Sequence, residues 1–71
     1  MNEYVVVTFP IKRAVLMDGE PCGFTNEVLT IEGGQHTFTL GEPLDYRPES
    51  QTVYVENTNI AHRQEVPFEK L

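Results

Sequence analysis

The fold class of this chain is decided by the stretch Arg13-Ala14-Val15-Leu16-Met17-Asp18-Gly19-Glu20-Pro21-Cys22-Gly23-Phe24-Thr25. It contains an Asp18-Gly19 pair between the apolar run Ala14–Met17 and a short return segment. A type I′ turn needs positive φ at both central residues, and Asp-Gly is among the pairs that meet this need best. The stretch therefore predicts a strand over residues 14–17, a tight turn, and a short return over residues 20–24. Because the return contains Pro21, it is expected at a sheet edge.

Length and charge set the class of protein. The 71 residues are enough for one domain with one small core. The formal net charge is −6, and the five Lys and Arg residues are dispersed along the chain. This composition argues against a nucleic-acid partner and disfavours anionic membranes. No signal peptide and no apolar run of about 20 residues is present, so we expect a cytoplasmic protein.

Further short β-prone segments follow along the chain. Residues 4–9 are almost wholly β-branched or aromatic and end at Pro10, so this strand is apolar on both faces. A reversal is expected at residues 32–34. The other expected strands cover residues 28–31, 35–40 and 52–56.

No helical periodicity persists along the chain. The sequence therefore predicts an all-β fold, a small antiparallel β-sandwich of about five to seven short strands with little or no helix. Alternation within the strands places the following residues in the core: Val5, Val7, Phe9, Val15, Met17, Leu29, Ile31, Phe38, Leu40, Tyr46, Val53 and Val55.

A series of spaced motifs runs from residue 5 to residue 56. It comprises Val15 and Met17 before Asp18-Gly19, Gly23-x-Thr25, Gly34-x-His36-x-Phe38-x-Leu40, and Tyr46-x-Pro48. This series resembles the PEGA domain, a family of small bacterial and archaeal β-sandwich domains. The resemblance implies a second hairpin at Gly34 and His36, and Tyr46 as the family tyrosine before the final strand. It also implies an accessory or interaction module of a prokaryotic protein.

The chain departs from the family pattern at three places: Lys12-Arg13 in the first corner, Asn26 after Thr25, and Asp45 before Tyr46.

Metal-binding and catalytic patterns are not evident. Cys22, His36 and His62 are the soft or borderline metal ligands, and they lie far apart, whereas a structural zinc site takes four ligands with a closely spaced pair. Because Cys22 is the only cysteine, an internal disulfide is excluded. No nucleophile motif surrounds Cys22 or Ser50. We therefore expect no enzyme activity, no metal and no cofactor.

Structural roles in turns and corners are expected for a second set of residues: Asp18, Gly19, Gly23, Gly34 and Tyr46.

The tyrosines support an alternative function. Tyr4, Tyr46 and Tyr54 would bind carbohydrate if their rings lay coplanar and exposed in one groove. The competing interpretation places Tyr46 at a corner and leaves Tyr4 and Tyr54 half-buried in strands.

The C-terminal residues 58–71 are the strongest candidate for an interaction segment. We expect a PEGA-like domain over residues 1–57 and a C-terminal tail over residues 58–71, docked on the sheet or flexible. Val66, Phe68 and Leu71 alternate with proline and charge in the tail, which makes them the candidate interaction surface. The tail could also donate a strand to another chain. The expected function is a non-enzymatic protein-interaction or accessory domain, acting on an unknown protein partner or by self-association through a sheet edge.

Overall fold

The computed structural model describes residues 2–71, so Met1 of the expected domain lies outside the described residues. These residues form nine strands and no helix, which confirms the all-β fold; no helix capable of spanning a membrane is therefore present among them. The strands are β1 (Asn2–Thr8), β2 (Ala14–Met17), β3 (Glu20–Phe24), β4 (Val28–Glu32), β5 (Gly34–Leu40), β6 (Tyr46–Arg47), β7 (Gln51–Val55), β8 (Gln64–Pro67) and β9 (Glu69–Lys70). The number exceeds expectation because β6, β8 and β9 arise in segments expected as loop or tail.

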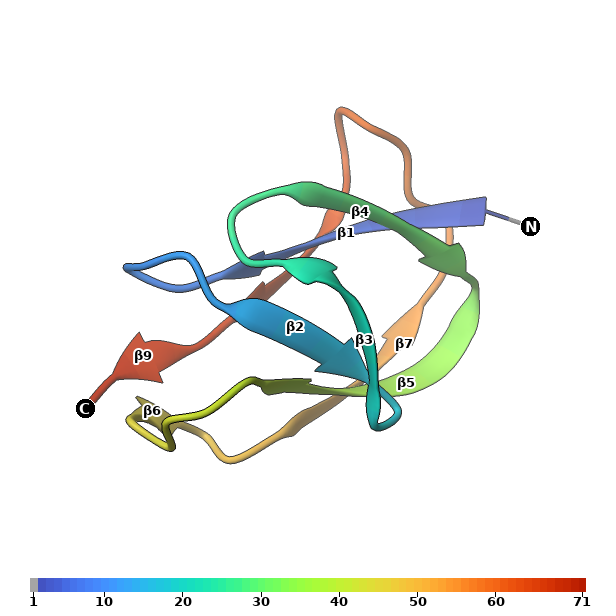
Figure 1. Ribbon diagram of the computed structural model, residues 1–71. Coiled ribbons are helices and arrows are strands. Elements are labelled where there is room, and N and C mark those ends of the chain that lie inside the picture. Colours follow the sequence, from blue (N-terminus) through green and yellow to red (C-terminus); the bar gives the residue numbers. More distant parts are fainter. Residues whose placement is uncertain (1) are drawn as a thin grey trace.

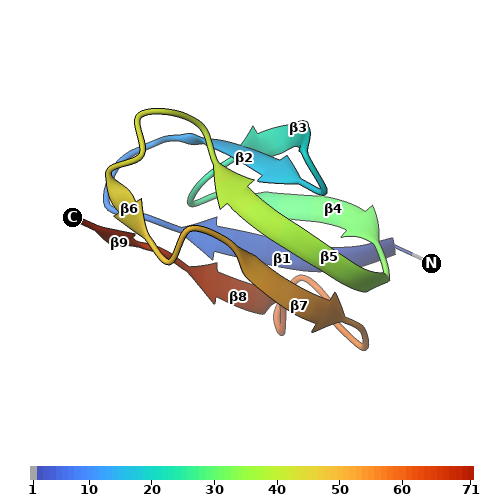
Figure 2. The same ribbon diagram turned by 90° about the horizontal axis from the view of Figure 1, so that it is seen from below.

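Two sheets face each other, and a two-stranded ribbon lies at one end (Figures 1 and 2). One sheet has the order β4-β1-β8, and the other has the order β3-β2-β5-β7. The ribbon pairs β6 with β9 and lies at the end marked C, opposite the end marked N (Figure 1).

One strand pair departs from the expected antiparallel arrangement, because β1 and β8 are parallel. The reason lies in the loop that precedes β8. In that loop Thr58 Oγ1 donates to Glu3 Oε1 and accepts from the backbone N–H of Tyr4, which holds the loop beside the start of β1. The chain therefore enters β8 at the end where β1 begins and runs in the same direction.

The central strand β1 is covered from both sides. Val5 and Val7 are fully buried in the core, and Val6 on the other face is only 8% exposed. β4 pairs with one side of β1 and β8 with the other, with Val7 opposite Val66. On the outer face Val6 lies between its cross-strand neighbours Val28 and Glu65, whose side chains flank it.

The hairpin between β2 and β3 has the geometry that the sequence predicts. Asp18 and Gly19 have φ angles of 54° and 88°, both positive as a type I′ turn requires. β3 is an outer strand of its sheet. Gly23 in β3 approaches β4 so closely that a Cβ atom there would lie 2.5 Å from Leu29 Cδ2.

The reversal at residues 32–34 is not a hairpin, so the second hairpin implied by the family resemblance is wrong. β4 and β5 lie in different sheets and do not pair with each other. Ile31 before the reversal and Phe38 after it both face the core, so the chain must cross from one sheet to the other. Gly34 makes this crossing with a φ of 123°, a conformation that favours glycine.

The expected core forms, with two additions from the tail. Val66 is fully buried and Phe68 is 4% exposed, whereas Met17 and Val53 pack only partly buried against the core. Val66 and Phe68 are therefore wrong as part of an interaction surface, because they fill the space between the sheets. Leu71, the third residue proposed there, is 65% exposed.

We predict that Phe68→Ala destabilises the domain by about 3–5 kcal/mol, the usual effect of removing a buried aromatic ring. Leu71→Ala should change stability by less than about 0.5 kcal/mol. Urea unfolding followed by circular dichroism measures both effects. Equal midpoints for Phe68→Ala and the parent protein would contradict the placement of the tail in the core.

Candidate functional site

β7 is an outer strand with an open side. It pairs with β5 on one side, and no strand of residues 2–71 pairs with the other. Its sequence, QTVYV, contains no charge, no proline and no glycine. Val55 is buried, Val53 packs against the core, and Tyr54 is 61% exposed. An outer strand of this composition is suited to pairing with an extended segment.

The other three outer strands of the two larger sheets carry features that oppose such pairing. β3 contains Pro21 and pairs with β2 in an irregular register. β8 contains Glu65 and Pro67, and β4 ends in Glu32. Proline, charge and irregular register are the usual means by which proteins protect sheet edges. Pairing is therefore least hindered at β7.

Side chains hold β7 in place. The hydroxyl groups of Thr37 and Thr52 share a hydrogen bond of 2.9 Å across the β5–β7 pair. The side-chain amide of Gln51 donates to the carbonyl of Pro67, which ties the start of β7 to β8 in the other sheet. These contacts use side chains of β7, and no strand of residues 2–71 pairs with the backbone groups on its outer side.

The hairpin turn is bonded to β5, the strand that supports β7. His36 Nδ1 donates to Asp18 Oδ2 (2.7 Å), and Nε2 donates to the carbonyl of Glu32 (2.8 Å). Both partners are acceptors, so an imidazolium with a proton on each ring nitrogen satisfies both contacts. The backbone N–H of Thr37 donates to Asp18 Oδ1 (2.9 Å). Asp18 thereby raises the pKa of His36, and His36 lowers the pKa of Asp18.

We predict that the domain loses stability as pH rises through the raised pKa of His36. A histidine whose pKa is raised by folding contributes its full stabilisation at pH values below its unfolded-state pKa of about 6.5. That stabilisation is lost as pH rises through the pKa of the folded state. Urea unfolding at a series of pH values around neutrality measures the effect. His36→Gln should flatten the pH dependence, and the exposed-residue control His62→Gln should retain it. An unchanged slope in His36→Gln would contradict the ion pair.

A cleft of about 440 Å³ opens where the β5–β7 pair ends. The residues that line it are Thr39, Leu44, Tyr46, Glu49 and Leu71. Thr39 follows Phe38, the last β5 residue paired with β7, and Glu49 lies two positions before β7 begins. The cleft therefore adjoins the open edge.

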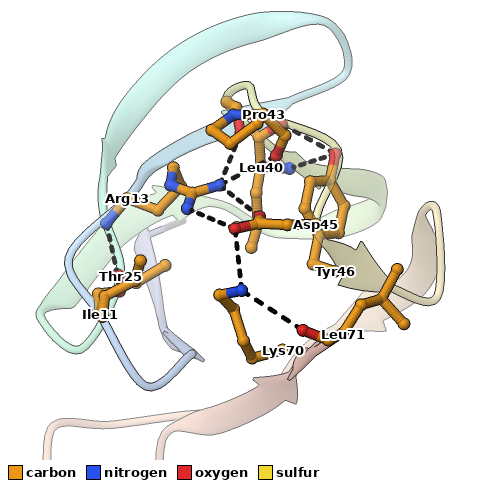
Figure 3. A network of polar contacts seen from close by, with 10 residues as sticks. Ile11, Arg13, Thr25, Leu40, Pro43, Asp45, Tyr46, Lys70 and Leu71 are labelled. Carbon is orange, nitrogen blue, oxygen red and sulfur yellow. Dashed lines mark hydrogen bonds and ion pairs between the residues drawn. The ribbon is translucent and has the colours of Figure 1, made fainter.

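An ion-pair network fixes the loop that forms one wall of the cleft (Figure 3). Arg13 Nη1 donates to Asp45 Oδ1 (2.9 Å) and to the carbonyls of Gly41 (3.2 Å) and Pro43 (3.0 Å). Lys70 Nζ lies 3.3 Å from Asp45 Oδ2. The Asp45 carboxylate thus joins β9 to the corner before β2, and the loop on both sides of Asp45 is held in place.

Tyr46 lines the cleft and is almost wholly buried. Its hydroxyl donates to the carbonyl of Leu40 (2.9 Å), and its ring meets the rings of Phe9 and Phe68 edge-on at centroid distances of 6.3 and 5.6 Å. Tyr46 therefore occupies a buried corner. Leu71 is held at the rim because its backbone N–H donates to the carbonyl of Asp45 (2.8 Å).

The hydrogen bonds from Arg13, with a smaller contribution from Lys70, lower the pKa of Asp45 to about 2. The contribution of Asp45 to stability is therefore present above its ordinary pKa of 3.8 and lost as pH falls through about 2. We predict that a carboxyl-detected NMR titration gives a pKa of about 2 for Asp45.

Arg13→Gln should raise this pKa toward the ordinary value. The control Arg47→Gln, which removes the exposed pair with Glu69, should leave it unchanged. An ordinary pKa for Asp45 in the parent protein would refute the network.

The metal and nucleophile residues considered in the sequence do not come together. Cys22 packs against the core, where burial raises the pKa of its thiol. His36 has both nitrogens bonded, and His62 lies in the exposed loop before β8. Among residues 2–71, no group of three or more His, Cys, Asp or Glu side chains is placed to hold a metal ion.

The three tyrosines do not form one exposed platform. Tyr46 is 6% exposed and Tyr54 is 61% exposed. Tyr4 is half-buried on β1, in the opposite sheet. Only Tyr54 presents an open ring, so the arrangement needed for stacking a sugar between several tyrosines is not present in the described chain.

Sequence analysis did not single out Leu44 or Glu49 in the cleft. The available signal was an apolar residue, Leu44, in a loop otherwise rich in proline and charge. That signal alone does not reveal the cleft, because the opposite wall comes from Leu71, far along the chain.

Comparisons with protein-family models, with curated proteins and with solved structures found no match. The resemblance to the PEGA domain therefore stays a prediction.

Proposed function

We propose that this domain is a non-enzymatic protein-interaction module that accepts an extended segment of another protein as an additional strand beside β7. The observation that carries the proposal is the open side of β7, which lacks charge, proline and irregular register. Backbone hydrogen bonds to the added strand would supply affinity. Side chains of the added strand would meet Tyr54 and Thr52 on the outer face and supply specificity.

The charges around β7 favour a basic segment. Glu49 and Glu56 flank β7. Neither has an ion-pair partner among residues 2–71, where Lys12, Arg13, Arg47 and Lys70 pair with other acids and Arg63 donates to the carbonyl of Ile60. An added strand with lysine or arginine would meet these carboxylates, and complementary charge both speeds association and selects partners.

The same charges disfavour self-association through this edge. An antiparallel pair of two β7 strands would place Glu49 of one copy near Glu56 of the other. Like charges at such positions destabilise strand pairing. The proposal therefore commits to a different, basic chain as the partner.

A synthetic peptide in which lysine and valine alternate tests this proposal. We predict that it shifts the backbone amide resonances of β7 in the labelled protein. Thr52→Lys should weaken the binding by roughly tenfold or more, because it places a cation against the lysines of the peptide. The matched control is Thr30→Lys, the same change at an exposed position of β4, which should bind like the parent protein.

Two results would overturn the proposal. One is resonance shifts confined to β4 or β3, with β7 unaffected. The other is the absence of shifts anywhere in the protein at peptide concentrations that saturate weak binding. Light scattering of the free protein adds an independent check, because a dimer abolished by Thr52→Lys would show that the partner is a second copy.

A further inference from the structure

The cleft beside β7 has apolar walls that are open to solvent. Leu44 is 75% exposed and Leu71 is 65% exposed, and the buried Tyr46 lines the same cleft. Large apolar side chains that are exposed together in a concave surface are typical of a binding site, whereas apolar residues exposed singly are common on any protein surface. The cleft is thus suited to an aliphatic stem.

One carboxylate stands in this apolar cleft. Glu49 is the only acidic residue among those that line it, and it has no ion-pair partner in residues 2–71. The cations at this end are engaged elsewhere, Arg13 and Lys70 with Asp45 and Arg47 with Glu69. A ligand in the cleft would therefore meet an uncompensated negative charge at Glu49.

An aliphatic stem that ends in a cation satisfies both features. Lysine and arginine side chains bury their methylene groups on apolar surface while the charged head remains at a polar site. An anionic ligand would meet Glu49 and a domain of net charge −6, so it is disfavoured. A purely apolar ligand would leave Glu49 without a partner.

The position of the cleft links it to the open edge. The β5–β7 pair ends at Phe38 opposite Gln51, and Thr39 and Glu49 continue from that end into the cleft. We propose that the cleft is a specificity pocket that receives a lysine or arginine side chain of the segment bound to β7, with Leu44 and Leu71 around the stem and Glu49 at the charged head. This inference rests on the proposed function, because it names the side chain by which the added strand is recognised.

The test uses the full chain with methyl-labelled leucine and labelled backbone amides. The probes are the lysine–valine peptide and a matched peptide in which glutamine replaces each lysine. The lysine peptide should shift the methyl resonances of Leu44 and Leu71 together with the amides of β7. The glutamine peptide should shift the β7 amides and leave both leucine methyl groups unchanged.

Two variants isolate the charge. Glu49→Gln should weaken binding of the lysine peptide by roughly two- to fivefold, the range of an exposed ion pair. The matched control Glu20→Gln makes the same change in net charge on β3 and should leave the affinity unchanged. Leu44→Ser should also weaken binding, whereas Ile60→Ser, at an equally exposed position away from the cleft, should not.

The outcomes separate this inference from the proposed function. If the β7 amides respond to both peptides and the leucine methyl groups respond to neither, the pocket is refuted and the open-edge function stands. If Glu49→Gln binds the lysine peptide as tightly as the parent protein does, the ion pair at the pocket is refuted. If neither β7 nor the leucines respond, both proposals fall.

Discussion

The parallel pairing of β8 with β1 is the constraint on which the rest of this structure depends. It buries Val66 beside Val7, and it brings Phe68 against Tyr46 through a backbone bond from Phe68 N–H to Thr8 O (2.9 Å). Burying one valine or phenylalanine side chain contributes about 1.5–3 kcal/mol, a large share of the 5–15 kcal/mol that is typical of a whole domain. A chain this short could not leave that surface exposed and remain well folded.

The same pairing determines where the domain can interact. Because β8 pairs with one side of β1, the outer strands of that sheet are β4 and β8, which carry charge or proline. The outer strand without such features is β7, in the other sheet. The ribbon of β6 and β9 then places Leu71 across from Leu44, so that the cleft and the open edge share one end of the sandwich. Asp45, bonded to Arg13 and Lys70, keeps the two walls together.

Residue alternation within strands and turn-forming pairs predict the strands and hairpins that depend on neighbouring residues in the sequence. Alternation placed Phe38 in the core, and the Asp18-Gly19 pair set the first hairpin. The strand β8 was not predictable in this way, since parallel pairing depends on a partner at the other end of the chain and leaves no turn signal. Arg13 and Asp45 are 32 positions apart, so their ion pair is equally invisible in the sequence.

Native-state amide hydrogen exchange tests the central claim, that the end of the chain completes the core and leaves β7 open. The account predicts that the backbone N–H of Val66 and that of Phe68 exchange as slowly as the amides of β1, through global unfolding. It also predicts that the β7 amides bonded to β5 exchange slowly while those on the outer side exchange fast. Fast exchange at Val66 and Phe68 would contradict the account, because β1 would then have an open side and β7 would no longer be the distinctive edge.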